Sequence, residues 1–489
     1  MATVAAGPAS ASNPNNSAKF RDAVTVDGIM KHLNALQDIA DTNDGTRAAG
    51  TSGYAASGDY VEGVLEAAGY DVTRQVFDIE YQAPGELEQI SPTPTTYETD
   101  SFTGSGAGDV TATVTGVDLQ FGIGNTSSSG CEAADFAGFP VGNIALIQRG
   151  TCPFADKAVN AEAAGASAVI IFNQGNTAGA DRQGLIVGTL GTADVNIPVV
   201  GGSYADGVDL NDPATTQARV FAADIEIRPT FNLIAETDTG RDDNIVMMGA
   251  HLDSVESGAG INDNGSGSAS ILETAVQLAK VNKLNNKVRF AWWGAEEMGL
   301  VGSTHYVNDL VANNPSELGR IATYLNFDMV GSPNYMIGVY DADQSTYPAP
   351  AGIPIPGGSI ETEDVLTNYF DAVGQPWVDT QFSGRSDYQA FIVNGVPASG
   401  LFTGAEGLKT PAQEALFGGT AEVAYDSNYH SSGDDIDNVN LEALDINSDA
   451  IAHTAITLAQ STATINGARS AGTSGNPHPV DDHLHEPAA

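Results

Sequence analysis

Histidine and carboxylate side chains stand close to short apolar runs of this chain. His251 follows the apolar run 244–248, and Asp263 lies shortly after it in a glycine-rich loop. Neutral imidazole together with carboxylate is the ligand set that Zn²⁺ prefers. Taken alone, the stretch could also be a histidine at a sheet edge beside a helix cap. The rest of the chain has to decide between the two interpretations.

Three more residues of ligand type occur later, and the complete set is His251, Asp263, Glu297, Asp328 and His430. Two zinc ions about 3.5–4 Å apart need a bridging carboxylate and about two further ligands each. We expect Asp263 to bridge the ions. One ion would then be completed by His251 and Asp328, and the other by Glu297 and His430.

Two neighbouring acids, Glu296 and Glu297, follow the apolar run 288–293. Because neighbouring side chains point in different directions, one can bind metal while the other faces a substrate. Glu296 could therefore be a general base that takes a proton from a water attacking a carbonyl carbon. Asp253, two residues after His251, could hold the other N–H of that imidazole. The alternative is an acidic pair that suits the dipole of a helix start.

The elements that must position these side chains follow from hydrophobic periodicity. The runs 244–248, 288–293 and 324–328 are typical of buried strands, and each is followed or ended by a histidine or an acid. Ligands of open α/β sheets bind at this edge. Helical spacing of apolar residues predicts helices over 25–40, 52–68, 268–278, 300–310 and 445–458. The pattern indicates an α/β domain.

A segment rich in Gly, Ser and Thr interrupts that pattern, and 489 residues exceed one ordinary core. We therefore expect a small mixed domain inserted in a larger one. The expected organisation is a flexible leader (1–20), the large domain (21–83 and 226–464), the insert (84–225) and a flexible tail (465–489).

Cys131 and Cys152 are the two cysteines of the chain. Without further partners they argue against a structural zinc site, and we expect a disulfide. Two unrelated buried thiols are the alternative. A disulfide favours an oxidising compartment, so a secreted protein is expected.

The charge balance excludes some classes of partner. The chain has 19 Lys and Arg against 62 Asp and Glu, a formal charge of −43. Nucleic acid and anionic membranes would be repelled by such a surface. No apolar run reaches the roughly 18 residues of a membrane span. We expect neither partner.

Seven stretches resemble the secreted di-zinc aminopeptidases of the streptomycete type. They are GAHLDS (249–254), GAGINDNGSG (258–267), FAWWGAEE (290–297), LNFDM (325–329), GRSD (384–387), GLFTGA (400–405) and YHSS (429–432). The resemblance covers about 20–82 and 225–462, and the insert resembles a protease-associated (PA) domain. It implies a three-layer α/β/α zinc-peptidase domain with a mixed central sheet, plus a small α+β, β-rich PA domain.

The resemblance also implies roles for single residues. It implies two zinc ions on the five ligands named above, with Glu296 as general base. Tyr429 would donate a hydrogen bond to the developing oxyanion, and Arg385 would help to orient the amino end of the substrate. Met329 and Phe402 would line an apolar pocket for a leucine-like side chain.

The match implies a cis peptide bond after Asp263, and it has two departures. Relatives often hold the last histidine loop with a disulfide, whereas this chain has Asn428 and Gly433 at those positions. Some members bind calcium through a pair that matches Asp445 and Asp449. The N-terminal partner is shifted here, and two acids at a helix start are the alternative.

These observations predict an extracellular, monomeric aminopeptidase that removes an apolar N-terminal residue from peptides with a free amino end. A carboxypeptidase or dipeptidase on the same scaffold is the first alternative. A peptide-binding relative without activity is the second.

Overall fold

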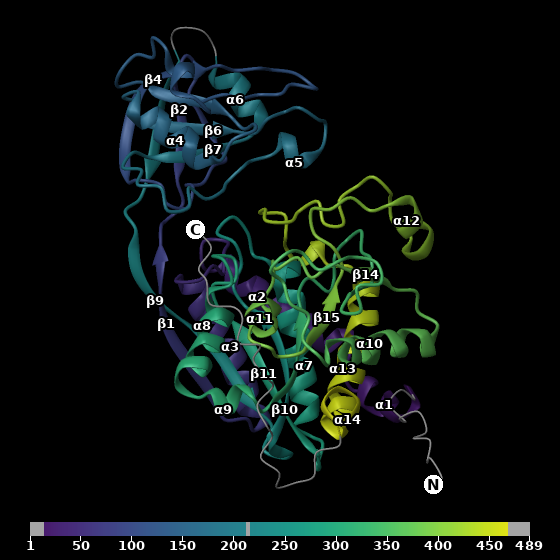
Figure 1. The fold of residues 1–489 in the computed structure, drawn as a ribbon. Coiled ribbons are helices and arrows are strands. Elements are labelled where there is room, and N and C mark those ends of the chain that lie inside the picture. The colour runs from purple at the N-terminus through teal and green to yellow at the C-terminus, as the bar shows by residue number, and fades with distance from the viewer. Residues whose placement is uncertain (1–13, 212–215, 468–489) are drawn as a thin grey trace. The chain divides into compact units, whose positions relative to one another are not determined.

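The computed structural model describes residues 14–211 and 216–467 (Figure 1). The chain divides into two compact units, which we call unit 1 (up to residue 79 and from residue 229) and unit 2 (residues 80–228). The first part of the expected leader and most of the expected tail lie outside the described residues. Residues 14–20, which we expected in the leader, belong to a helix, α1 (Pro14–Arg21).

An eight-stranded sheet in the order β1-β9-β11-β10-β12-β15-β13-β14 forms the centre of unit 1. Strands β10, β11 and β12 run parallel, whereas β9 pairs antiparallel with β11 and β13 antiparallel with β15. The predicted mixed sheet is confirmed. The strands are β1 (Val72–Tyr81), β9 (Glu226–Glu236), β10 (Arg241–His251), β11 (Asn286–Trp293), β12 (Ile321–Phe327), β13 (Gly338–Tyr340), β14 (Val378–Thr380) and β15 (Ala398–Phe402).

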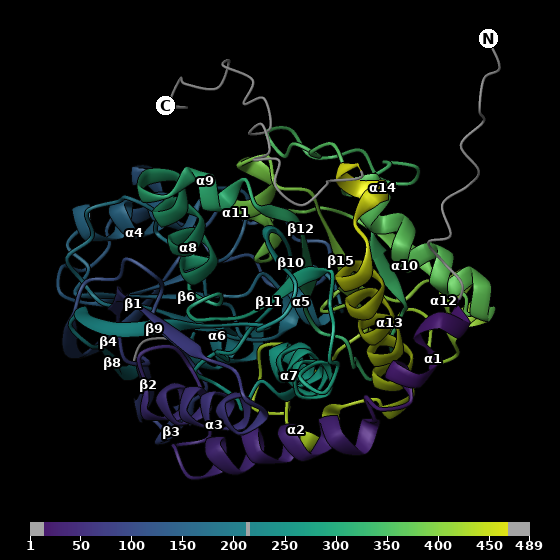
Figure 2. The same cartoon turned by 90° about the horizontal axis from the view of Figure 1, so that it is seen from below.

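Helices cover both faces of this sheet, which gives the three predicted layers. Figure 2 shows α2, α3 and α7 on one side and α8, α9 and α11 on the other. The helices after α1 are α2 (Val26–Asp41), α3 (Ser52–Ala68), α7 (Gly267–Leu278), α8 (Val301–Asn313), α9 (Pro315–Leu318), α10 (Ser359–Val373), α11 (Tyr388–Val393), α12 (Pro411–Phe417), α13 (Leu441–Gln460) and α14 (Ala463–Asn466).

Local sequence explains where the first helices begin and end. The Thr25 hydroxyl caps α2 by accepting from the N–H of Gly28, and the Thr51 hydroxyl caps α3 in the same way. Such caps satisfy backbone donors that have no partner within the helix. Helix α3 ends at Gly69, whose φ of 100° is left-handed.

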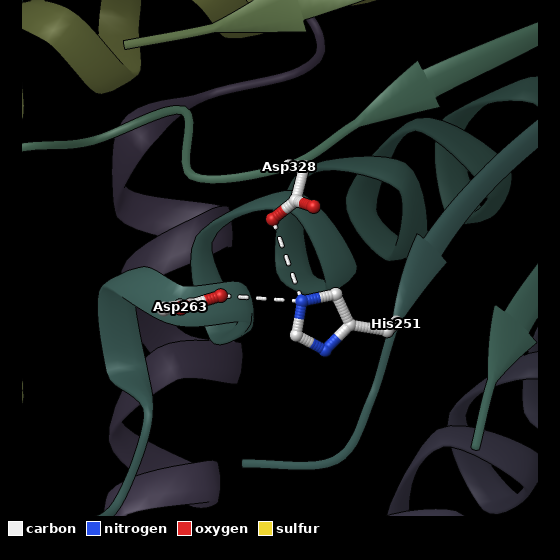
Figure 3. A group of neighbouring side chains, drawn as sticks. All are labelled: His251, Asp263 and Asp328. Atoms are coloured by element: carbon white, nitrogen blue, oxygen red, sulfur yellow. Dashed lines mark ion pairs between the residues drawn. The ribbon is translucent and has the colours of Figure 1, made fainter. Parts of the chain in front are cut away.

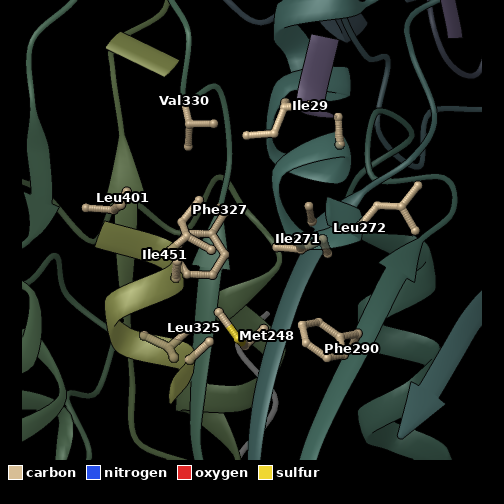
Figure 4. Packing of buried hydrophobic residues seen from close by; sticks show 14 of the residues in the cluster. Ile29, Met248, Ile271, Leu272, Phe290, Leu325, Phe327, Val330, Leu401 and Ile451 are labelled. Atoms are coloured by element: carbon tan, nitrogen blue, oxygen red, sulfur yellow. The ribbon is translucent and has the colours of Figure 1, made fainter. Parts of the chain in front are cut away.

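The main core lies between the sheet and the helices on one face (Figure 4). Met248, Phe290 and Phe327 project from the three parallel strands and pack in one cluster with Ile271 of α7 and Ile451 of α13. All five are fully buried, and each contributes roughly 1.5–3 kcal/mol to stability. This packing fixes the strands whose ends carry the candidate ligands.

Unit 2 contains a seven-stranded sheet in the order β3-β2-β8-β4-β5-β6-β7. The predicted disulfide between Cys131 and Cys152 is confirmed in this unit. The strands and helices are β2 (Glu86–Ser91), β3 (Thr95–Tyr97), β4 (Gly108–Val117), β5 (Ile144–Gln148), β6 (Ala168–Phe172), β7 (Val199–Gly202), β8 (Gln217–Ala222), α4 (Phe154–Ala163), α5 (Ala180–Gln183) and α6 (Tyr204–Leu210). Among the described residues of both units, no helix is long and apolar enough to cross a membrane.

Candidate metal centre

The three parallel strands bring their carboxyl ends to one edge of the sheet. Strand β10 ends at His251, which is in register with Trp293 at the end of β11. Glu296 and Glu297 follow β11 after a short turn, and Asp328 directly follows β12. The carboxyl-end edge of the sheet therefore carries His251, the acidic pair and Asp328, as the sequence predicted.

The candidate ligands form two groups that share Asp263. Nε2 of His251 lies 3.2 Å from Oδ1 of Asp263 and 3.4 Å from Oδ1 of Asp328 (Figure 3). Nε2 of His430 lies 3.4 Å from Oδ2 of Asp263 and 3.0 Å from Oε2 of Glu297. Each oxygen of Asp263 thus faces a different histidine, as a bridging carboxylate would.

The donor atoms fit zinc in kind, spacing and hydrogen bonding. Ligand atoms around a tetrahedral zinc ion with bonds of about 2.0–2.1 Å lie about 3.3 Å apart, close to the separations between these donors. Oδ1 of Asp328 and Oε1 of Glu297 are buried without a hydrogen-bond partner among the described residues. Such oxygens are costly unless something else satisfies them, and a metal cation would do so.

The electrostatics of the centre favour positive charge. Burial alone would lower the pKa of His430, but Glu297 and Asp263 raise that pKa to about 11. Burial raises the pKa of Glu296 well above its usual value, and the nearby carboxylates of Asp387 and Asp328 act in the same direction. An excess of buried carboxylates is most stable when cations neutralise it.

Asp253 lies against the second ring nitrogen of His251, mainly through its backbone. Nδ1 of His251 lies 3.0 Å from the backbone carbonyl oxygen of Asp253 and 3.6 Å from its carboxylate. That carboxylate accepts the backbone N–H groups of Glu296 and Glu297, each at 3.2 Å. Asp253 therefore holds the acidic pair as well as the imidazole.

A serine that the sequence did not indicate supports Asp328. The hydroxyl of Ser386 donates to Oδ2 of Asp328 at 2.5 Å and accepts from the side-chain amide of Asn326 at 2.7 Å. The sequence around Ser386 gives no sign of this role, because Ser386 and Asp328 are 58 positions apart and meet only in the folded chain.

A cavity of about 650 Å³ opens over the centre. It is lined by the five candidate ligands together with Glu296, Met329, Arg385, Phe402 and Tyr429. The ring of Tyr429 stacks on that of His430, with centroids 3.8 Å apart. Arg385 donates to the Tyr429 hydroxyl at 3.4 Å and to Glu406 at 2.8 Å. Glu406 is a cavity residue that the sequence did not single out.

Hydrogen bonds hold the last histidine loop at Asn428, one of the two positions where the resemblance implied that relatives carry a disulfide. The Asn428 amide donates to the side-chain oxygen of Asn438, and the backbone N–H of Asn428 donates to Asp426. A side chain at Gly433 would collide with Asn428, whose Oδ1 lies 2.6 Å from where a Cβ would stand. The peptide bond after Asp263 is cis, as the resemblance implied.

The pair Asp445 and Asp449 is not among the ligand groups found in residues 14–211 and 216–467. Oδ2 of Asp449 accepts from Arg21 at 2.5 Å and from the Tyr369 hydroxyl at 3.3 Å. The arginine already supplies a positive charge to Asp449.

Comparison with known proteins connects this geometry to a family. Residues 232–455 match the model of peptidase family M28, and residues 110–210 match the PA domain. An aminopeptidase of Pseudomonas aeruginosa is 51% identical over 443 residues, which span 89% of this chain and 81% of that protein. A Mycobacterium tuberculosis protein named "Probable lipoprotein aminopeptidase" is 42% identical, over 89% of this chain and 85% of that protein.

A solved structure gives the same result. The zinc aminopeptidase of Bacillus subtilis superposes with a TM-score of 0.67 at 27% identity, covering 88% of this chain and 94% of that one. The aminopeptidase of Pseudomonas aeruginosa is identical at more than half of the aligned positions over most of both chains, which shows common descent. The chain belongs to peptidase family M28 and carries a PA domain.

Proposed function

We propose that this chain is a zinc aminopeptidase that uses two zinc ions. The observation that carries the proposal is the position of Asp263, whose two oxygens face His251 and His430 beside an open cavity. The names of the relatives support aminopeptidase activity. The finer likeness to the streptomycete enzymes stays a prediction.

Five side chains would hold the metal ions. Asp263 would be shared, with His251 and Asp328 on one side and Glu297 and His430 on the other. Zinc ions bound there would polarise a peptide carbonyl and lower the pKa of a water molecule.

Glu296 would move the proton. It lines the cavity but belongs to neither ligand group. Its carboxylate would accept a proton from the attacking water as the C–O bond forms, and would pass that proton to the amide nitrogen as the C–N bond breaks.

Tyr429 would stabilise the oxyanion. Its hydroxyl accepts a hydrogen bond from Arg385, and because arginine can only donate, the tyrosine proton stays available. That proton would be donated to the carbonyl oxygen as negative charge develops. The predicted substrate contact of Arg385 is supported by its place in the cavity wall.

Substrate selection would follow from charge and shape. The carboxylates of Glu296 and Asp328 would attract a free α-ammonium group. Met329 and Phe402 line the cavity and would favour leucine-like first residues. Action on peptides outside the cytoplasm is our further proposal, supported by the disulfide. The monomeric state stays a prediction. Calcium at Asp445 and Asp449 stays a prediction that the Arg21 contact does not favour.

Peptides blocked at either end test the proposal. A free leucyl peptide should be cleaved with release of leucine, an N-acetylated one should not, and C-terminal amidation should have little effect. Cleavage of the acetylated peptide together with loss on amidation would indicate a carboxypeptidase. A protein that binds two zinc ions but hydrolyses no peptide would be a binding protein.

A further inference from the structure

Residues 252–263, which we call the ligand loop, connect His251 of one ligand group to the shared Asp263. The segment 252–260 has neither helix nor strand, and much of it is buried. Buried backbone N–H and C=O groups need partners, so other parts of the chain must supply them. Gly258 approaches the last histidine loop so closely that a Cβ would lie 2.3 Å from the carbonyl oxygen of Ser431.

The guanidinium group of Arg47 bonds to one side of this loop. It donates through Nη1 to Leu252 at 2.5 Å, through Nε to Ala259 at 2.8 Å and through Nη2 to Gly260 at 2.7 Å, in each case to the backbone carbonyl. Arg47 is wholly buried. Burial lowers the pKa of Arg47 only to about 10, so it remains a cation at neutral pH. Three donors fixed in one plane are a property of arginine and not of lysine.

The carboxylate of Asp434 holds the other end of the loop. Its Oδ1 accepts from the backbone N–H of Asn262 at 2.8 Å, and its Oδ2 accepts from that of Asp263 at 2.9 Å. Only 2% of Asp434 is exposed. Arg47 belongs to the first chain segment of unit 1 and Asp434 to the second. Neither belongs to a ligand group among the described residues.

We propose that Arg47 and Asp434 are positioning residues that hold the backbone of the ligand loop, so that His251 and Asp263 stand at metal-binding separation before zinc arrives. A buried polar group is costly unless it is hydrogen-bonded. Here five hydrogen bonds to the backbone, with one more from the Asn438 side chain to Asp434, satisfy both side chains. The inference rests on the proposed zinc site and adds the residues that prepare it.

Two pairs of variants test the inference. Arg47→Lys and Asp434→Asn should weaken Zn²⁺ binding by about 10- to 100-fold, as is usual for residues that orient ligands. At saturating zinc, kcat should fall while KM changes little. The zinc affinity is measured by competition with a chelating dye, beside the thermal midpoint of each variant.

The chain offers matched controls for both changes. Arg289 is a partly buried arginine of β11 that pairs with Glu236 and Glu317. Asp100 of unit 2 accepts two backbone N–H groups, those of Gly85 and Ser101, as Asp434 does at the ligand loop. Arg289→Lys and Asp100→Asn should lower the thermal midpoint yet leave zinc affinity within about twofold. Equal zinc affinity in all four variants would reduce Arg47 and Asp434 to a general structural role and overturn the inference.

Hydrogen exchange gives an answer even if a variant does not fold. In wild-type protein stripped of metal by a chelator, the amides of Asn262 and Asp263 should stay protected. Exchange as fast as in an unfolded chain would show that the loop is not held before metal binds. A wild-type chain that binds no zinc would overturn the proposed function and this inference with it.

Discussion

The adjacent acids Glu296 and Glu297 have separate positions in the centre although they are neighbours in the chain. Glu297 lies 3.0 Å from His430 and belongs to a ligand group. Glu296 faces the cavity without joining either group. Asp253 accepts the backbone N–H of both residues, which fixes the backbone from which the two side chains project.

We expect Glu296→Gln to keep both zinc ions and to lose activity. The amide removes the base, and general-base catalysis is worth roughly 10²–10⁴-fold in rate. Glu297→Gln should instead lose zinc, because it removes a ligand. Metal content by emission spectroscopy and kcat on a leucyl peptide distinguish the two. Retained turnover in Glu296→Gln, or zinc loss equal to that of Glu297→Gln, would contradict the assigned role.

Side chains of the centre differ in how far the sequence reveals them. His251 and Asp328 could be predicted as a pair because each stands where a buried parallel strand ends. Arg47 could not, because its partners are backbone carbonyls about 205 to 213 positions away. Backbone partners leave no trace in the types of residue that surround them. Asp434 could not be predicted either, because it accepts the backbone N–H groups of Asn262 and Asp263.

At the scale of elements, strong hydrophobic periodicity made prediction possible and its absence prevented it. The predicted helix 52–68 and the strand run 288–293 match α3 and β11 closely. Strands β13 and β14 have three residues each, too few for a periodic pattern. These short strands and β15 complete the sheet through pairing with distant partners.

Helix α1 shows how an element without a strong pattern is fixed in place. It packs on α13, where the Ser17 hydroxyl lies 2.7 Å from Nδ1 of His453. Arg21 binds Asp449, and the ring of Tyr369 stacks on His453. Burial, with Arg21 as a smaller influence, lowers the pKa of His453 to about 4.

The buried His453 should make the stability of unit 1 depend on pH. The folded state keeps His453 neutral, whereas the unfolded state binds a proton below pH 6.5. Stability should therefore fall as the pH decreases from about 6.5 to 4, by up to about 3 kcal/mol from this residue. His453→Gln cannot titrate and should have a shallower slope of unfolding free energy against pH in urea titrations. The same slope in both proteins would exclude His453 as the cause.

At the scale of the whole molecule, the two units have separate cores. The clusters around the eight-stranded sheet contain residues of unit 1 only, and those around the seven-stranded sheet contain residues of unit 2 only. The composition of the insert made this division visible in the sequence. A chain with two cores need not unfold in a single transition.

We expect calorimetry to resolve two transitions that respond to different changes. The disulfide closes a loop of unit 2 over a separation of 21 residues, so Cys131→Ser with Cys152→Ser should cost about 3 kcal/mol. For a unit of this size the shift is roughly 6–12 °C. A chelator should lower the other transition, because the five proposed zinc ligands all lie in unit 1. Zinc content and kcat of the double variant should match those of the wild type. A single transition lowered by both treatments would mean that the two units unfold together. Bound zinc would then stabilise the whole chain and not unit 1 alone.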